Sequence, residues 1–184
     1  MGSCLTNKEL FRVNNILYEN QFGFREKTRT EDALRNCYNQ LITHSKSFNV
    51  VIAVGLKKSF DSANFEVLKI KLVKMDFSEE AIKYLMSYLK GRKQYVQLVS
   101  EGVIIKSEEV EVDGGVPQGS VLVPLLFLIF INDLARYIKL KTNKCVSSEY
   151  SLILFADDII LTLSNKSIDS LEIDLYIVLN IIEE

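Results

Sequence analysis

Apolar residues recur at three- and four-residue intervals in several stretches of this chain, and this spacing predicts helices with one apolar face. The stretches are residues 6–19, 30–45, 64–75, 78–91 and the tail from Ser167 onward. Asn64 and Ser78 should begin two of these helices, because their side-chain oxygens can accept hydrogen bonds from the first backbone N–H groups of a helix. Gly91 should end the helix that Ser78 begins, since glycine readily takes the left-handed conformation that follows many helices.

Other apolar runs have the length and β-branched character of strands. These runs are residues 49–54, 93–100 and 103–112. The first, NVVIAV, is continuous and predicts a buried strand. A turn near Glu101–Gly102 should separate the other two. Residues 151–164, SLILFADDIILTLS, predict two strands around a tight turn that holds Ala156, Asp157 and Asp158.

Residues 114–120, GGVPQGS, predict a loop, because glycine and proline interrupt regular structure. The apolar run after this loop extends to about Tyr137 and is too long for a typical strand, so it predicts one buried helix. Helices and strands alternate too irregularly for repeated βαβ units. We therefore expect an α+β fold in which a small antiparallel sheet is backed by helices.

Composition indicates one globular domain. The chain has 184 residues, of which 48% are hydrophobic and 25% charged, so it can build a core and is not expected to be disordered. Its net charge of −2 and pI near 5.6 weigh mildly against a self-sufficient nucleic-acid binder, which is usually basic. A basic face within a larger assembly stays open.

The cysteine and histidine content indicates the cellular compartment and limits which residues could bind a metal. Cys4, Cys37 and Cys145 are widely spaced, which predicts reduced thiols without a disulfide partner in an intracellular protein, cytoplasmic or nuclear. His44 is the only histidine, so a metal site would have to use oxygen ligands. The longest apolar run, residues 121–131, is shorter than the roughly 20 residues of a membrane helix, so no membrane span is expected.

Asp157 and Asp158 stand between two apolar runs, where an unpaired charge is costly. Two adjacent acids at a hairpin tip can aim at one point, and carboxylates suit Mg²⁺, which also keeps waters and binds substrate phosphates. Polymerases place two such ions about 3.5–4 Å apart. An ordinary Asp-rich turn is the alternative, and the pair by itself favours that simpler interpretation.

Four further blocks precede the FADD segment in a fixed order. They are residues 20–34 (NQFGFREKTRTEDAL), 56–72 (LKKSFDSANFEVLKIKL), 88–98 (YLKGRKQYVQL) and 115–134 (GVPQGSVLVPLLFLIFINDL). With FADD, the series resembles the reverse transcriptases of non-LTR, LINE-type retrotransposons. The similarity extends from about Leu10 to Glu184.

The resemblance implies a fold and a reaction. It implies one reverse transcriptase domain fragment over residues 1–184, with partial fingers at about 1–50 and a polymerase palm at about 51–184. The family's thumb would follow Glu184 and is expected to be absent. The family is an RNA-directed DNA polymerase, a nucleotidyltransferase that uses an RNA template, a DNA primer, deoxynucleoside triphosphates and Mg²⁺ or Mn²⁺.

The resemblance also implies roles for individual residues, which are carried over by position. Asp157 would be a catalytic ligand of both metal ions, and Asp158 would support it. Phe60 would lie under the sugar of the incoming nucleotide and exclude a 2′-hydroxyl, or it is simply a core residue. Gln118 and Gly119 would line the nucleotide and the template. Arg25 and Arg29 would contact template or triphosphate, although a position on the solvated surface is an equal alternative for both.

One departure from the family pattern concerns the metal site. The family has an aspartate that bridges both metals at the end of the strand before LKKSFD, and here that position is Gly55. Asp61 lies six residues further on and cannot reach that place along a strand or a helix. Val123 and Phe65 also replace a usual glycine and a usual histidine. Metal binding is therefore expected to be weakened.

Two hypotheses follow. The chain is a reverse transcriptase domain whose catalysis is impaired by Gly55 and by the missing thumb, or it is a non-catalytic relic that binds nucleic acid or protein at most. Primer extension beside a Gly55→Asp variant separates them.

Overall fold

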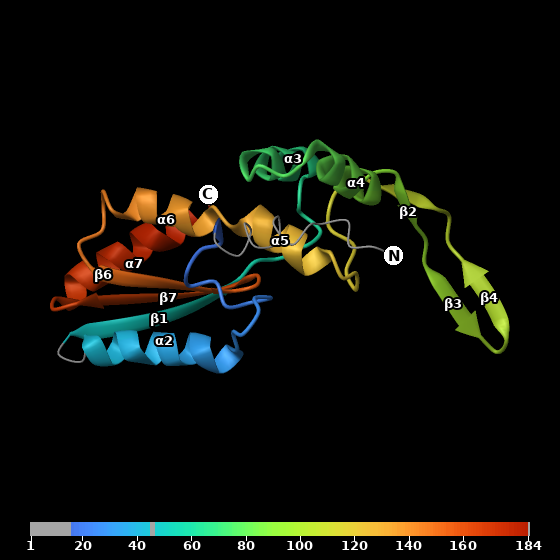
Figure 1. Ribbon diagram of the computed structural model, residues 1–184. Coiled ribbons are helices and arrows are strands. Elements are labelled where there is room, and N and C mark those ends of the chain that lie inside the picture. The colour runs from blue at the N-terminus through green and yellow to red at the C-terminus, as the bar shows by residue number, and fades with distance from the viewer. Residues whose placement is uncertain (1–15, 45–46, 184) are drawn as a thin grey trace. The chain divides into compact units, whose positions relative to one another are not determined.

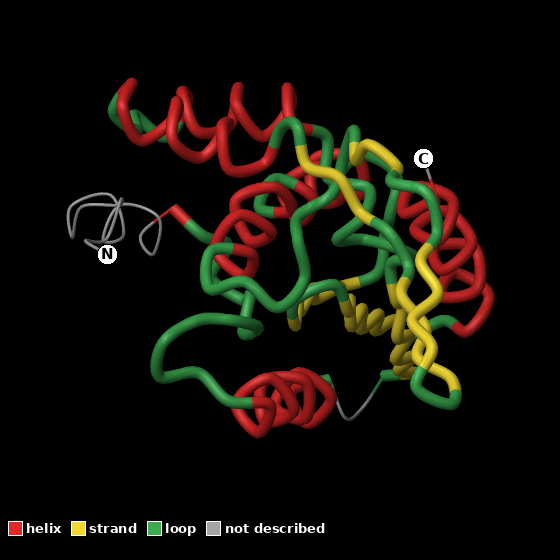
Figure 2. The backbone as a smooth tube through the Cα atoms, turned by 90° about the vertical axis from the view of Figure 1, so that its right-hand side faces the viewer, coloured by secondary structure: helices red, strands yellow, loops and turns green. Residues whose placement is uncertain are grey.

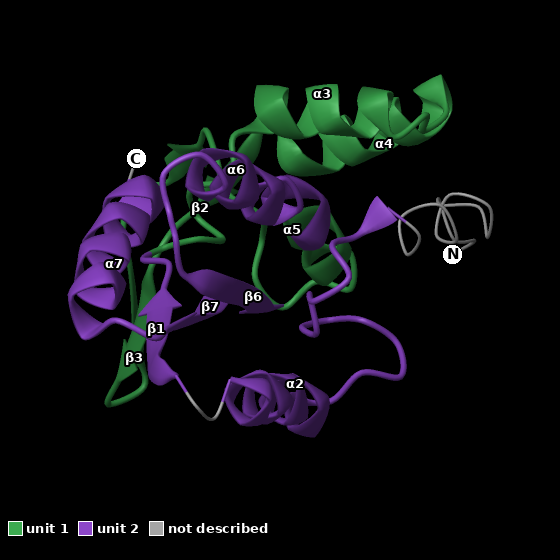
Figure 3. Ribbon diagram, turned by 90° about the vertical axis from the view of Figure 1, so that its left-hand side faces the viewer, with its two compact units in different colours: residues 1–13, 58–127 green, residues 14–57, 128–184 purple. Residues whose placement is uncertain are grey.

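A computed structural model describes residues 16–44 and 47–183 of the chain. Its contacts divide the chain into two compact units, whose described parts are residues 58–127 in unit 1 and residues 16–44, 47–57 and 128–183 in unit 2 (Figure 3). Most of the helix expected at residues 6–19, and also Cys4, lie outside the described residues. Cys37 and Cys145 are free thiols. In the part of the chain that is described, none of the helices is long and apolar enough to cross a membrane.

Unit 2 is built on a three-stranded antiparallel sheet in the order β1-β7-β6 (Figure 1). Its strands are β1 (Phe48–Gly55), β6 (Glu149–Phe155) and β7 (Asp158–Asn165). Helices α6 (Leu134–Thr142) and α7 (Ile168–Glu183) lie on one side of this sheet, and α2 (Thr30–Thr43) lies on the other (Figures 1 and 3). The expected α+β fold, with a small antiparallel sheet backed by helices, is confirmed.

The core of unit 2 fills the space between the sheet and helices α6 and α7. Apolar side chains from β6, β7, α6 and α7 are buried there (Ala135, Ile138, Leu152, Leu154, Ile159, Leu161, Leu163, Leu171, Val178 and Ile181). Burying such side chains stabilises the fold by roughly 1.5–3 kcal/mol for each large one. This core holds the β6–β7 hairpin in place along most of its length.

The strand expected at residues 49–54 forms as β1, but its expected burial is wrong. Every residue of β1 is exposed or half-buried. Val50, Ile52 and Val54 turn one face toward the core, whereas Val51 on the opposite face is 46% exposed. β1 is an edge strand, and α2 packs against β6 and β7, so the outer face of β1 meets water, as antiparallel sheets allow.

Unit 1 contains a helical pair, α3 (Phe65–Lys74) and α4 (Glu79–Leu89), packed through buried leucines. The expected caps are confirmed: the Asn64 side chain accepts hydrogen bonds from the N–H groups of Glu66 and Val67, and Ser78 accepts one from Ala81. Gly91 follows α4 with a φ of +68°, as expected for a helix end.

A long two-stranded ribbon follows α4 in unit 1 (Figures 1 and 2). Each of the two expected strands is broken, so the ribbon consists of two antiparallel pairs, β2 (Arg92–Gln94) with β5 (Val110–Val112) and β3 (Gln97–Ser100) with β4 (Val103–Lys106). The ladder is interrupted where the Ser107 hydroxyl, and not a backbone carbonyl, accepts the Val96 N–H at 2.9 Å. The turn at Glu101–Gly102 is confirmed.

The single buried helix expected up to Tyr137 is wrong, because the run forms α5 (Val123–Ile131) and α6, with a break at Asn132–Asp133. The Asn132 side chain accepts the Tyr18 N–H at 2.8 Å and donates to the Ile16 carbonyl at 3.1 Å. These long-range bonds use the Asn132 amide to anchor the segment before α2. The periodicity of the apolar residues gave no sign of the break.

Candidate active site

The β6–β7 hairpin turns over two residues, Ala156 and Asp157, between the paired residues Phe155 and Asp158. The tight turn is confirmed, although Asp158 is the first residue of β7 and not part of the turn. Ala156 has a φ of +56°, whereas Asp157 is not among the residues with positive φ. A positive φ at the first central residue alone is typical of a type II′ turn, where glycine is preferred. The alanine therefore holds a conformation that its side chain disfavours.

Gly55 lies directly opposite Asp158 in the antiparallel pairing of β1 with β7. The Leu56 N–H extends this pairing with a hydrogen bond to the Asp157 carbonyl at 3.3 Å. Because directly opposed residues point to the same face, a side chain at position 55 would face Asp158. A Cβ there would lie 3.5 Å from Asp158 Oδ1, an ordinary contact, and among the described residues no other atom is within 4 Å. Neither space nor backbone conformation requires glycine.

The carboxylates belong to adjacent residues, with Asp157 half-buried in the turn and Asp158 exposed at the start of β7. Two adjacent oxygen ligands of this kind fit one Mg²⁺, which completes its shell with waters and phosphate oxygens. Position 55, which the resemblance implies would bridge a second ion, has no carboxylate because it is Gly55. Within residues 16–44 and 47–183, no group of three or more His, Cys, Asp or Glu side chains is placed to hold a metal ion.

The two arginines predicted to contact template or triphosphate both belong to unit 2. Arg25 is half-buried, and its Nη1 donates to the carbonyls of Tyr18, Glu19 and Gln21, each at 3.3 Å. Arg29 is exposed, and its backbone N–H donates to the Asp32 carboxylate at 2.9 Å, at the start of α2. Arg25 thus has a clear structural task, while the side chain of Arg29 reaches solvent. Their nucleic-acid contacts stay predictions.

Two buried polar side chains of unit 2 were missed by sequence reasoning. Gln21 is 2% exposed and bonds the hairpin tip, and Asp174 is 3% exposed and accepts four hydrogen bonds from Ser147 and Ser148. Burial raises the pKa of Asp174, but the bonds from the two serines outweigh it and lower the pKa below its usual value. The NQFGFR block drew attention to the segment that contains Gln21, but the sequence did not show that Gln21 bonds Ala156.

Phe60 belongs to unit 1, where its ring stacks on that of Phe127 with centroids 4.1 Å apart. The ring is half-buried, so Phe60 is neither a fully enclosed core residue nor a free surface one. The GGV segment supports it, because the Val116 N–H donates to the Phe60 carbonyl and the Gly115 N–H to the Ala63 carbonyl, both at 2.9 Å. A Cβ on Gly115 would come within 2.8 Å of the Asp61 Cα, so this close approach requires glycine.

Gln118 and Gly119, also in unit 1, are both exposed. Gln118 lines a pocket of about 320 Å³ together with Arg92, whose guanidinium donates to the Gly115 carbonyl at 2.6 Å. Gly119 has a φ of +87°, and no described atom lies within 4 Å of the place its Cβ would take. The loop thus offers an exposed amide and an open glycine backbone.

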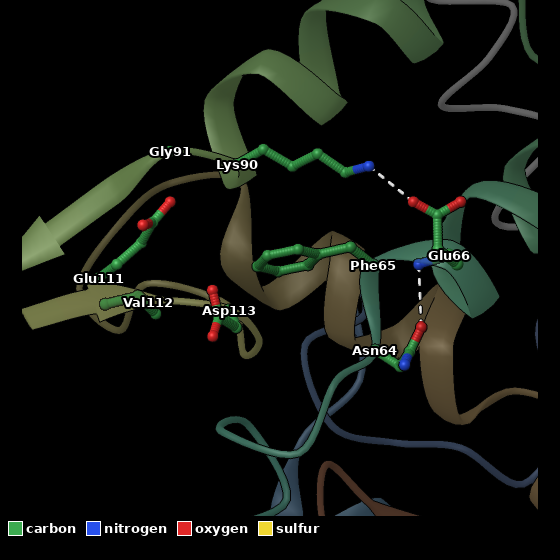
Figure 4. A pocket seen from close by; sticks show the side chains of 8 residues that line it. All are labelled: Asn64, Phe65, Glu66, Lys90, Gly91, Glu111, Val112 and Asp113. Atoms are coloured by element: carbon green, nitrogen blue, oxygen red, sulfur yellow. Dashed lines mark hydrogen bonds and ion pairs between the residues drawn. The ribbon is translucent and has the colours of Figure 1, made fainter.

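A second pocket of unit 1, of about 310 Å³, is lined by residues from α3, the end of α4 and β5 (Figure 4). The Lys90 ammonium lies 2.6 Å from the Glu66 carboxylate and holds the pKa of that carboxyl below its usual range. Phe65, which stands where a histidine is usual in the family, faces this pocket. None of the predicted site residues lines it.

Comparison with known proteins gives relatives from mobile elements. The chain is 30% identical over 159 residues to a probable RNA-directed DNA polymerase from transposon X-element of Drosophila melanogaster. It is 29% identical over 170 residues to the RNA-directed DNA polymerase from mobile element jockey of the same species. These matches cover 85% and 91% of this chain, but only 16% and 18% of the relatives. The chain therefore spans less than a fifth of their length.

Solved structures with the same fold include telomerases. One from Candida tropicalis has a TM-score of 0.64 at 17% identity and matches 96% of this chain and 36% of its own. Another, from Candida albicans in complex with a TWJ fragment of telomeric RNA, has a TM-score of 0.65 at 11% identity. That match covers 94% of this chain and 32% of the telomerase chain. At these identities the likeness concerns the fold. The mobile-element relatives confirm the expected resemblance to the reverse transcriptases of non-LTR retrotransposons. Residues 3–184 match the family described as reverse transcriptase (RNA-dependent DNA polymerase), and the chain therefore belongs to that family.

Proposed function

We propose that this chain is the fingers and palm portion of an RNA-directed DNA polymerase of a non-LTR retrotransposon whose catalytic step is impaired at one metal ligand. Residues from about 1 to 50 would belong to the fingers, and residues from about 51 to 184 would belong to the palm. The substrates would be an RNA template, a DNA primer and deoxynucleoside triphosphates. Family membership and the mobile-element relatives support this reaction class.

A single observation carries the proposal. Gly55 is paired directly with Asp158 at the end of β1, one residue from the turn that holds Asp157. A carboxylate at position 55 would share one face with Asp158, which is the arrangement that two-metal nucleotidyl transfer needs. Space for that side chain exists, and the side chain is missing.

Each predicted residue has a proposed task. Asp157 and Asp158 would hold Mg²⁺ or Mn²⁺, which stabilises charge on the attacking and leaving oxygens when bound. Phe60, which is half-buried and stacks its ring on that of Phe127, would lie beneath the nucleotide sugar. The remaining residues would contact nucleic acid or triphosphate (Gln118, Gly119, Arg25 and Arg29).

The missing ligand is expected to be costly. Phosphoryl transfer depends on positioning and charge stabilisation, so losing the shared carboxylate should cost about a thousandfold or more in rate. The chain as it stands should give no detectable primer extension on an RNA template. Gly55→Asp should restore measurable Mg²⁺-dependent synthesis when it is tested in a form extended through a thumb of the family.

The test pairs that extended form with three variants, Gly55→Asp, Gly55→Ala and Gly55→Asp combined with Asp157→Asn. We expect product only from Gly55→Asp, together with tighter Mn²⁺ binding measured by electron paramagnetic resonance. Strong extension with Gly55 in place, abolished by Asp157→Ala, would show that another acid completes the site. No extension and no Mn²⁺ binding by Gly55→Asp would favour the alternative, a non-catalytic relic.

A further inference from the structure

Gln21 forms a bonded link between the NQFGFR segment and the hairpin tip, both within unit 2. Its Oε1 accepts the Ala156 N–H at 3.0 Å and the Gly23 N–H at 2.8 Å. Its Nε2 donates to the Ala156 carbonyl at 3.4 Å. The glutamine amide therefore pairs with both backbone groups of one residue, as a neighbouring strand would.

Ala156 needs such a partner because it is 7% exposed and lies in the turn, outside the backbone ladder. A buried N–H or C=O without a hydrogen bond is costly, so nearly all such groups in native proteins are paired. Gln21 supplies both bonds from a position 135 residues away in the sequence. Asparagine would be one methylene too short for the same place, and an apolar side chain would leave both groups unpaired.

The backbone around Gln21 is fitted to the same turn. The Phe22 N–H donates to the Leu154 carbonyl, and the Leu154 N–H donates to the Asn20 carbonyl, both at 2.8 Å. A Cβ on Gly23 would lie only 2.1 Å from the Ala156 nitrogen, so the segment lies against the turn more closely than any side chain would allow. Ala156, with its positive φ, is therefore in close contact with Gly23 and is hydrogen-bonded to Gln21.

We propose that Gln21 is the positioning residue of the hairpin tip, fixing the Ala156–Asp157 turn in its disfavoured conformation and thereby setting the direction of the Asp157 and Asp158 carboxylates. The turn conformation follows from contacts within unit 2. The link to metal binding rests on the proposed function.

The first test is site-resolved amide hydrogen exchange of the chain with Gln21→Met, which keeps the length of the side chain and removes its polar atoms. Exchange at Ala156 and Gly23 should accelerate on the order of tenfold or more, while core strand amides such as Leu161 keep their protection. Gln97→Met, at an exposed position of β3, is the matched control and should change none of them. Unchanged protection at Ala156 and Gly23 would overturn the proposal, and so would an equal loss at all strand amides.

If Gln21→Met does not fold, Gln21→Glu decides the same question. The carboxylate keeps an acceptor for the Ala156 and Gly23 N–H groups and loses the donor to the Ala156 carbonyl. Both amides should then stay protected. Loss of their protection in a folded Gln21→Glu chain would show that the Gln21 oxygen does not hold the turn.

The second test asks whether the turn sets the carboxylates. In the Gly55→Asp background, Gln21→Met should weaken Mn²⁺ binding by about tenfold. An unchanged affinity, with Ala156 exchange accelerated, would reduce Gln21 to a structural role and overturn the positioning claim. If Gly55→Asp binds no Mn²⁺ at Asp157, the proposed function fails, and the exchange result still decides whether Gln21 fixes the turn.

Discussion

Two hairpins of this chain turn over two central residues, and their turns are stabilised in different ways. In the β3–β4 ribbon, Glu101 and Gly102 have φ values of +50° and +78°, the pattern of a type I′ turn that matches strand twist. All residues of β3 and β4 are exposed, so that turn depends on its own residues. In the β6–β7 hairpin, Ala156 takes a positive φ without glycine and is held by Gln21 and the tightly packed Gly23.

The bases of the two hairpins differ in the same way. Ser107 closes the β3–β4 ribbon locally, exchanging hydrogen bonds with Val96 at 2.9 Å. The segment that leads into β6 is closed by Asp174 of α7, whose Oδ2 accepts the N–H and hydroxyl groups of Ser147 and Ser148 at 2.7–3.0 Å. The comparison teaches that the hairpin carrying the predicted metal ligands takes its geometry from distant segments, whereas the exposed ribbon forms from neighbouring residues.

The largest expected effect comes from Gly23→Ala. The new methyl group would collide with the Ala156 backbone, and neither segment can move without breaking the bonds at the tip. We expect the free energy of unfolding to fall by about 3 kcal/mol or more, as judged by urea denaturation. Gly55→Ala is the control in the same unit, because its Cβ has room, and it should be neutral or slightly stabilising. Equal effects of the two variants would contradict the close contact at Gly23.

Asp174→Asn should come next, with a loss of about 2 kcal/mol in the free energy of unfolding at pH 7, since the buried carboxylate accepts four hydrogen bonds. The folded pKa of Asp174 is lowered, so its contribution is present above the unfolded pKa of about 4. That contribution is lost as pH falls through the folded pKa. The difference between the two proteins should therefore shrink on acidification. Asp169→Asn, at an exposed position of α7, is the control and should lower the free energy of unfolding at pH 7 much less than Asp174→Asn does.

Gly55→Asp should have a smaller effect that depends on metal. The new carboxylate would face Asp158, and repulsion between them should lower the free energy of unfolding by about 1 kcal/mol without Mg²⁺. The gain from replacing glycine in a strand works against this loss. Thermal melts with and without Mg²⁺ should show partial recovery in Mg²⁺. A melt of the variant that is insensitive to Mg²⁺ would mean that the metal site is not assembled.

The smallest effect is expected in the exposed ribbon. Glu101→Asn creates an Asn-Gly pair, which favours positive φ at both turn residues, and should stabilise the β3–β4 turn by about 0.5 kcal/mol. Amide hydrogen exchange measures this effect, and we expect it to become slower in β3 and β4 and to stay unchanged in β6 and β7. A change that spreads to the β6–β7 hairpin would contradict the local character of the ribbon.

The sequence by itself determined the features that depend on residues close together along the chain. The caps of α3 and α4 at Asn64 and Ser78, the Glu101–Gly102 turn and the FADD hairpin were predictable because each is decided within a few residues. The family followed from the order of five sequence blocks. The pairing of Gly55 with Asp158 came from the structure. The metal-binding and substrate roles of the site residues stay predictions.

Only the tertiary structure decided the features that join distant residues. Four features depend on partners 26 to 135 residues away or on what covers a sheet face: the break at Asn132–Asp133, the exposed face of β1, the burial of Asp174 and the bonds from Gln21 to Ala156. Their local patterns resemble an uninterrupted helix, a buried strand and ordinary polar positions. Buried polar groups must find partners in space, and a sequence pattern does not show which distant segment supplies them.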